Sequence, residues 1–377
     1  MLWLILGSLL PSLIVCWAVA WSVRWWGPRL GLVDRPGQRK IHQRPMSTGG
    51  GIAIWAGIVV PFAVGQLVLW ILVSMKDSQP ELIAWLPESI VVHLDGLMAR
   101  SGQLWILLAA GTALTLLGLI DDLKGVKWHV RLIVEAIVAI IVVQLGWKMS
   151  LFVDIPWLTN LLSVIWIVGL INSFNMLDNM DGLSAGVAAI AATMLAAVML
   201  MMPDPTTGGP QLFVGGFLLV LVGSLVGFLF HNRPPARLFM GDTGSYLVGF
   251  LVAVGSLSAT FAGGELPRHA ILAPLCVLAV PLYDTVTVVC IRLRAGKSPF
   301  EGDNNHFSHR LVELGLSRSQ AVLTIWLVTA TCGLGALLLY QINFLGACLI
   351  FLQVICILLV IAILEATARR KNRRKKK

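Results

Sequence analysis

Charged side chains are scarce in this sequence. Asp, Glu, Lys and Arg together make up 12% of its 377 residues, whereas hydrophobic residues make up 57%. A soluble domain carries about a quarter charged residues, so this chain has too few to cover a hydrophobic core with polar surface. The scarcity excludes an ordinary soluble protein and predicts that the lipid bilayer is its solvent. No basic stretch is interleaved with stacking aromatics on a soluble module, which argues against a nucleic-acid partner.

Closely spaced cysteines are also lacking. The six cysteines lie in or at the edge of apolar runs, with no CxxC pair and no short metal-ligand spacing. We therefore expect neither a disulfide nor a zinc site, and we interpret the cysteines as small packing residues.

Apolar stretches long enough to cross about 30 Å of hydrocarbon recur along the whole sequence. The first has no Lys or Arg before it and is too long for a signal-peptide core, so we expect a membrane helix there. We predict eleven spans, near residues 2–23, 51–73, 103–120, 130–146, 158–174, 183–202, 212–230, 246–262, 270–291, 321–340 and 346–366. The predicted fold class is an all-α integral membrane protein. It is a polytopic bundle that forms one multi-spanning domain over 1–368, followed by a basic tail at 369–377.

Eleven spans put the two termini on opposite sides of the membrane. With the N-terminus outside, the inside segments contain 24 of the 28 Lys and Arg residues. Because Lys and Arg are retained on the cytoplasmic side, we predict an outside N-terminus and a cytoplasmic C-terminus.

The same topology brings unusual polar side chains to the cytoplasmic face. They are Asp34, His42, Asp121, Asp122, Asn172, Asn175, Asp178, Asp181, Asp242, Asp284, His306 and His309. An acidic residue inside a span costs about 2.5–3.5 kcal/mol at mid-bilayer on insertion scales. Convergence of several from separate helices therefore predicts a shared ligand.

Asp121 and Asp122 end the third predicted span, where they face the negative end of the helix dipole and repel each other. This placement favours a general base with a raised pKa or a ligand for a hard cation. Neutralisation by Lys124 and Lys127 is the simpler alternative.

The segment 172–182 carries four polar side chains that cannot share one face of a straight helix. We expect the helix to break near Asn179, with Gly182 allowing the chain to turn around a site.

Two later segments also carry candidate ligands. In the segment 239–245, Asp242 is either a helix N-cap or part of a phosphate-binding helix start. His306 and His309 allow a metal pair, but Arg310 beside them favours a diphosphate.

These segments, in this order, resemble the polyprenyl-phosphate N-acetylhexosamine-1-phosphate transferases of glycosyltransferase family 4. That family includes the phospho-muramoyl-pentapeptide transferases. The matching stretches are Asp34-Arg35-Pro36 through Arg39-Lys40-Ile41-His42 to Gly51, Gly118 to Asp122, Asn172 to Gly182, Phe239 to Ser245, Pro281 to Asp284 and Ser298 to Arg310. Together they cover nearly the whole chain.

The resemblance implies transfer of N-acetylhexosamine-1-phosphate from a UDP-sugar to undecaprenyl or another polyprenyl phosphate, releasing UMP. It also implies Mg²⁺, for which Mn²⁺ could substitute, and a first step of cell-envelope polysaccharide synthesis. The setting would be the inner membrane of a bacterium, with the active site facing the cytoplasm; a homodimer is left open. The loop near the histidines favours UDP-N-acetylglucosamine as the donor.

Carried over by position, the resemblance also implies roles for single residues. Catalytic roles fall on Asp121, Asp122, Asp178 and Asp181, and metal binding on Asp242 and Asp178. Substrate-binding roles fall on Asn172, Asn175, His42, Arg39, Lys40, His306, His309 and Arg310. The chain departs from the family pattern at Gly37, Gly125 and Ser308, and the last two weaken the roles given to the Asp pair and to His309.

Two other functions fit the sequence less well. Asp178-x-x-Asp181-Gly182-x-x-Ala185 echoes the CDP-alcohol phosphotransferase signature, but Gly186 replaces its Arg and the two further Asp residues are lacking. An ion-coupled transporter would need acids near mid-bilayer, whereas here they gather at the inner ends of the predicted helices.

Overall fold

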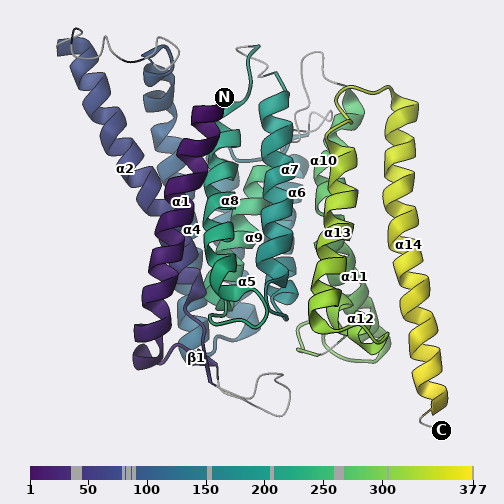
Figure 1. Cartoon of the computed structure of the whole chain (residues 1–377). Coiled ribbons are helices and arrows are strands. Elements are labelled where there is room, and N and C mark those ends of the chain that lie inside the picture. Colours follow the sequence, from purple (N-terminus) through teal and green to yellow (C-terminus); the bar gives the residue numbers. More distant parts are fainter. Residues whose placement is uncertain are drawn as a thin grey trace.

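Long apolar helices make up most of the computed structural model, which describes residues 1–34, 45–78, 81, 86, 91–150, 155–203, 208–258, 267–303 and 305–375. The helices run roughly side by side (Figure 1), and the N- and C-termini lie at opposite ends of the bundle. The long helices are α1 (Leu2–Trp26), α2 (Gly50–Ser78), α4 (Leu94–Lys124), α5 (Trp128–Gln144), α6 (Pro156–Leu177), α7 (Leu183–Met201), α8 (Leu212–Asn232), α9 (Gly241–Leu257), α11 (Ala279–Arg294), α13 (Arg318–Ala336) and α14 (Phe344–Lys375). Shorter elements are the 3₁₀ helices Gly27–Leu30 and Arg268–Leu272, helices α10 (Ala273–Val277) and α12 (Phe307–Glu313), and strands β1 (Val33–Asp34) and β2 (Met46–Ser47).

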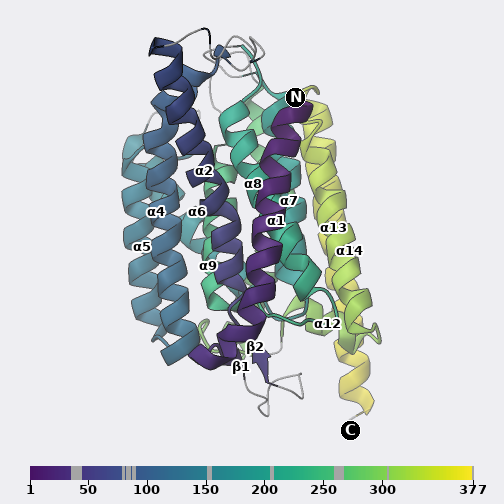
Figure 2. The same ribbon diagram turned by 60° about the vertical axis from the view of Figure 1, so that its left-hand side comes forward.

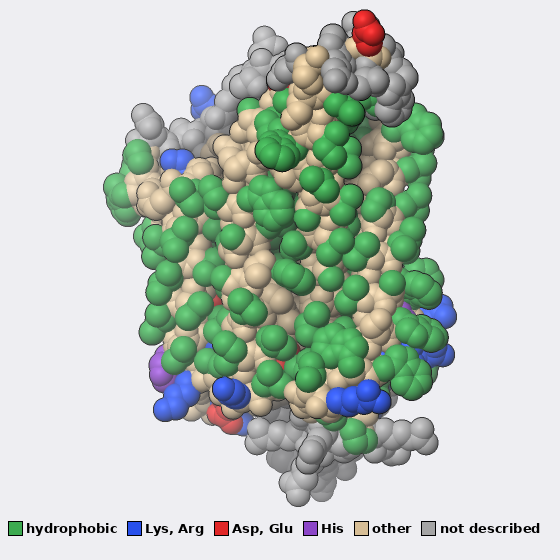
Figure 3. All heavy atoms as spheres, turned by 90° about the vertical axis from the view of Figure 1, so that its left-hand side faces the viewer, with side chains coloured by type: hydrophobic (Ala, Val, Ile, Leu, Met, Phe, Trp, Pro, Cys, Tyr) green, Lys and Arg blue, Asp and Glu red, His purple; other side chains and the backbone are tan. Residues whose placement is uncertain are grey.

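Eight of the described helices are long and apolar enough to cross a bilayer, and a ninth span arises if the segment bent by 67° between Val277 and Ala279 counts as one. Helices α5 and α9 lie where the fourth and eighth spans were predicted, but each has only 17 residues. The all-α, multi-pass architecture is therefore confirmed, while the count of eleven and the orientation of the termini stay predictions. Figure 3 shows the apolar outer face, with most of the visible Lys and Arg side chains towards the end where Figure 1 places β1.

Helix α9 lies at the centre of the bundle, where it packs against α4, α6, α2, α7 and α8. From Thr243 to Leu257 its residues are buried. Figure 2 shows α9 behind α2 and α1, which form an outer layer. An inner helix surrounded by protein on all sides is expected to be mostly apolar, and beyond its first turn α9 carries only Ser245, Tyr246 and Ser256 as polar side chains.

Two glycines allow neighbouring helices to approach the start of α9. A Cβ on Gly118 of α4 would lie 2.3 Å from the carbonyl oxygen of Asp242, and one on Gly51 of α2 would lie 2.2 Å from the Gly244 nitrogen. Larger residues would push the first turn of α9 away.

A two-stranded hairpin joins this same region to the loop before α9. Strands β1 and β2 pair antiparallel, with Val33 opposite Ser47. The Phe239 N–H donates to the Ser47 carbonyl at 2.8 Å, and the Gly50 N–H donates to the Phe239 carbonyl at 2.9 Å. Segments far apart in sequence are thus held together at one end of the bundle.

Candidate active site

A cavity of about 950 Å³ lies at the end of the bundle that carries β1 and α12. It is formed by the ends of α4 and α6, the starts of α9 and α13, the hairpin and α12. Its acidic lining residues are Asp34, Asp121, Asp122, Asp178, Asp181, Asp242 and Asp303, and its basic or histidine lining residues are His306, His309 and Arg318. The structure therefore gathers most of the predicted polar residues in one cavity.

Asp121 is held by three donors. Arg131 Nη1 donates to Asp121 Oδ2 at 2.9 Å, and the Tyr246 hydroxyl donates to the same oxygen at 2.7 Å. The Val126 N–H donates to Oδ1 at 2.6 Å. The carboxylate is buried, and an ion pair and two hydrogen bonds compensate its desolvation. Arg131 supplies the balancing charge, rather than the Lys124 and Lys127 of the simpler alternative.

Asp122 contacts the first turn of α9. Its Oδ1 accepts from the Asp242 N–H at 2.9 Å, and its Oδ2 accepts from the Thr243 N–H at 3.0 Å and the Thr243 hydroxyl at 2.6 Å. The first N–H groups of a helix have no partner within the helix. A carboxylate from α4 therefore serves as the cap of α9.

The predicted break after α6 is confirmed. The helix ends at Leu177, and α7 begins at Leu183 after a turn that ends at Gly182 with φ +74°. This backbone conformation favours glycine. The turn directs Asp178 into the cavity and lets Asp181 Oδ2 accept from the Ala236 N–H at 2.9 Å.

Asp178 lies among other acids. Burial, together with the charges of Asp122 and Asp181, raises the pKa of Asp178 to about 7, although a hydrogen bond from the Gly241 N–H partly opposes this.

Asn175 joins α6 to α9. Its Nδ2 donates to Asp242 Oδ1 at 2.5 Å and to Ser245 Oγ at 3.1 Å. The last turn of α6 thus holds the first turn of α9.

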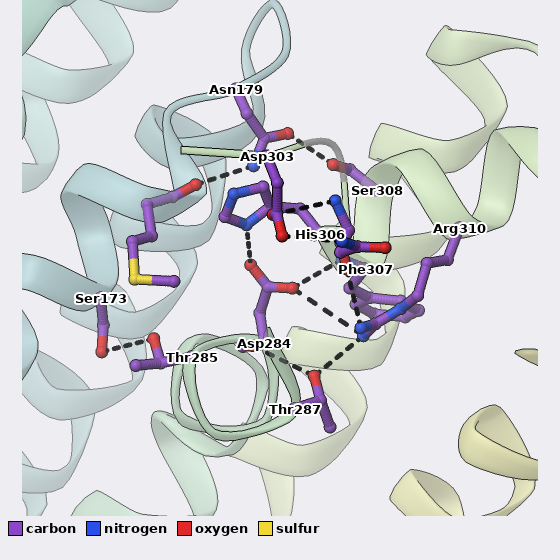
Figure 4. A network of polar contacts seen from close by, with 12 residues as sticks. Ser173, Asn179, Asp284, Thr285, Thr287, Asp303, His306, Phe307, Ser308 and Arg310 are labelled. Atoms are coloured by element: carbon purple, nitrogen blue, oxygen red, sulfur yellow. Dashed lines mark hydrogen bonds and ion pairs between the residues drawn. The ribbon is translucent and has the colours of Figure 1, made fainter. Parts of the chain in front are cut away.

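The histidine segment is organised by Asp284 of α11 (Figure 4). Asp284 Oδ1 accepts from the Phe307 N–H at 2.6 Å, and Oδ2 lies 3.0 Å from His306 Nδ1. A carboxylate only accepts, so Nδ1 carries the proton and Nε2 is left for the cavity that His306 lines.

Two further contacts fix this segment. Ser308 donates from Oγ to Asn179 Oδ1 at 2.5 Å and so joins α12 to the turn after α6. His309 lines the cavity, and burial lowers the pKa of His309. Neutral His309 is thereby favoured.

Two predicted substrate ligands lie outside the described lining. Asn172 donates to Glu135 Oε2 of α5 at 2.5 Å. Arg310 is buried and donates to the Asn305 carbonyl at 2.9 Å and to Thr287 Oγ1 at 3.0 Å, and its Nε lies 3.0 Å from Glu365 of α14. Both side chains join helices around the cavity, and direct substrate contact stays only a prediction for them. His42, Arg39 and Lys40 lie outside the described residues.

The sequence interpretation missed several residues of the site. Arg131, Tyr246, Glu135 and Arg318 were assigned no role, and Asp284 was noted without one. A polar side chain inside an apolar run was the available signal for Glu135 and Tyr246, since each lies within a predicted span.

The residues of this cavity suit a hard cation. Among the described residues, no group of three or more His, Cys, Asp or Glu side chains has metal-binding geometry. Mg²⁺, however, is commonly bound by one or two carboxylates together with water and substrate phosphates. Asp178 and Asp242 line one cavity, and Thr48 Oγ1, beside them, is buried without a hydrogen-bond partner in the described part of the chain. Asp178 and Asp242 are the residues that would hold the ion.

The fold is that of a multi-pass membrane protein, and its candidate site is an acidic cavity at one end of the helix bundle. The family model described as "Glycosyl transferase family 4" matches residues 104–260. The chain is also 30% identical over 320 residues to the "Probable undecaprenyl-phosphate N-acetylglucosaminyl 1-phosphate transferase" of Bacillus subtilis, covering 82% of this chain and 78% of that one. The chain belongs to glycosyl transferase family 4.

Two further relatives have related names. The "Decaprenyl-phosphate N-acetylglucosaminephosphotransferase" of Mycolicibacterium smegmatis is 30% identical over 332 residues, covering 82% of this chain and 75% of the relative. The "Undecaprenyl-phosphate alpha-N-acetylglucosaminyl 1-phosphate transferase" of Escherichia coli K12 is 27% identical over 319 residues, covering 80% and 75%. The predicted family is thus confirmed.

Proposed function

We propose that this protein transfers N-acetylglucosamine-1-phosphate from UDP-N-acetylglucosamine to a polyprenyl phosphate and releases UMP. The named activities of its relatives support this reaction, and the acidic cavity at one end of the membrane bundle is the observation that carries it. An acceptor phosphate held at the membrane surface and a soluble donor can meet only at such an end. We place this end on the cytoplasmic side of a bacterial inner membrane.

In this reaction an oxygen of the lipid phosphate bonds to the sugar-bearing phosphorus of the donor, and the bond from that phosphorus to the UMP oxygen breaks. Both partners are anions, and so is the cavity wall. Mg²⁺, when bound by Asp178 and Asp242, would neutralise charge that builds on the phosphates. On the wall that carries α12 and α13, Arg318 can bind phosphate oxygens.

Arg318 is the one Lys or Arg among the described residues that line the cavity, and it is exposed. We assign it to the donor diphosphate. Arg131 forms an ion pair with Asp121, and Arg310 is buried and is not among the described residues that line the cavity.

The test is release of UMP by the purified protein in detergent. We expect UMP only when UDP-N-acetylglucosamine, polyprenyl phosphate and Mg²⁺ are all present, and less of it with UDP-sugars that lack the N-acetyl group. UMP release without the lipid, or ion flux through liposomes without any UMP release, would contradict the proposal. The second outcome would favour a transporter.

A further inference from the structure

The amino end of α9 is capped by two carboxylates, one from α4 and one from the turn after α6. The Gly241 N–H contacts Asp178, and the next two N–H groups, of Asp242 and Thr243, donate to Asp122. The Thr243 hydroxyl adds a third bond to Asp122 at 2.6 Å. Both oxygens of Asp122 are therefore engaged in holding α9.

This contact is tightly fitted. Gly241 has φ +71°, and a Cβ there would lie 2.5 Å from Asp122 Oδ2. On the same side Gly118, one turn before Asp122, allows the Asp242 carbonyl to approach α4. A carboxylate at a helix amino end also interacts favourably with the helix dipole. Three of the roughly four lone-pair sites of the Asp122 carboxylate are used by α9, so taking a proton from a substrate would weaken the bonds that hold this helix start.

Asp242 lies within the turn that Asp122 caps. On its other side Asn175 holds the Asp242 carboxylate from α6. The direction of Asp242 therefore depends on a backbone contact with Asp122 and on side-chain contacts with Asn175 and Asp121. Asp121, by contrast, meets α9 through the side chains of Tyr246 and Asp242, and in the described part of the chain it accepts no hydrogen bond from the α9 backbone.

We propose that Asp122 is a positioning residue whose carboxylate caps α9 and so directs Asp242 towards the cation and the donor phosphates; it is not the proton acceptor of the Asp121–Asp122 pair. This inference rests on the proposed function. It separates two adjacent carboxylates that the sequence treats alike.

The test uses a variant that leaves the Asp122 carboxylate intact. Thr243→Val removes one bond to Asp122 and keeps the shape of the side chain, while Thr243→Ser restores the hydroxyl. The control is Thr115→Val, which removes the buried Thr115 hydroxyl of α4 that donates to the Gly111 carbonyl, away from the cavity. Binding of Mn²⁺ alone, followed by electron paramagnetic resonance, reports on the site without requiring turnover.

We expect Thr243→Val to weaken Mn²⁺ binding about tenfold, the effect of one hydrogen bond to a charged group. Asp122→Asn should weaken it further, Thr243→Ser should recover most of the loss, and Thr115→Val should have no effect. In turnover assays the Thr243→Val defect should shrink as Mg²⁺ is raised.

Three results would overturn the inference. They are wild-type Mn²⁺ affinity in both Thr243→Val and Asp122→Asn, a turnover loss in Asp122→Asn with unchanged Mn²⁺ binding and thermal stability, and no Mn²⁺ binding by the wild type. Failure of the proposed function looks different, because the wild type would release no UMP while the Mn²⁺ affinities still followed the expected order.

Discussion

Replacing Asp284 by Asn tests whether the tautomer of His306 matters for turnover. The wild-type carboxylate accepts both from the Phe307 N–H at 2.6 Å and from His306 Nδ1 at 3.0 Å. An amide has one accepting oxygen. If that oxygen stays with Phe307, the amide NH₂ faces Nδ1 and moves the imidazole proton to Nε2, reversing the hydrogen-bonding character that the ring presents to the cavity.

If the amide instead turns over, the Phe307 N–H at the start of α12 loses its acceptor. Loss of such a cap costs about 0.5–2 kcal/mol of stability, and in both orientations the negative charge 3.9 Å from Arg310 is lost. We expect kcat for UMP release to fall by about 10²–10⁴-fold, the usual contribution of a positioned acid–base group. The melting temperature should fall only modestly.

The assay measures UMP release and thermal unfolding of the same preparation. The matched control is Asp95→Asn, because Asp95 is an exposed carboxylate paired with Lys76 near the start of α4, at the other end of that helix from the cavity. Wild-type turnover in Asp284→Asn would refute the tautomer argument. A collapse of stability equal to the loss of activity would reduce Asp284 to a structural cap.

Three further outcomes are expected. Arg318→Ala should raise the KM for UDP-N-acetylglucosamine about tenfold, with a smaller change in kcat, because it removes a charge-assisted phosphate contact; an unchanged KM would contradict the assignment. Burial and two neighbouring carboxylates raise the pKa of Asp178 to about 7, so between about pH 4 and 7 the folded state keeps a proton that the unfolded chain has lost. Thermal stability in EDTA should therefore fall as the pH rises through this window, and Asp178→Asn should flatten the profile. Gly186→Ala should cost about 1–3 kcal/mol by overpacking, since a Cβ there would lie 2.0 Å from the Trp326 ring; Gly169→Ala, on α6 with nothing within 4 Å of the added Cβ, should not lower the melting temperature.

Features that depend on local sequence could be predicted. The break after α6 follows from the spacing of four polar residues and one glycine, and the structure places the end of the helix at Leu177, two residues before the expected position. The gathering of Asp121, Asp178 and Asp242 in one cavity followed from an alternating topology, because every second helix end meets the same membrane surface.

The partners of these carboxylates could not be predicted in the same way. Tyr246 is 125 residues from Asp121 in the sequence, and nothing in its own segment indicates that its hydroxyl faces α4. Arg131 is closer in sequence but lies on the next helix, so its pairing depends on how α4 and α5 pack. Glu135 lies in an apolar run that predicts only a span, and its burial against Asn172 appears once α5 and α6 are placed together.

The buried carboxylates differ in whether a positive charge or several hydrogen-bond donors offset their loss of hydration, and this difference separates structural from functional acids. Asp121 has Arg131, and Asp284 has His306 and the start of α12. For Asp178, in contrast, burial and the charges of Asp122 and Asp181 raise the pKa. A membrane protein retains a costly arrangement of this kind where a ligand relieves it. The cation should therefore bind at Asp178 and at Asp242, whose donor Asn175 is a neutral amide, while Asp122 should act by holding the start of α9 in place.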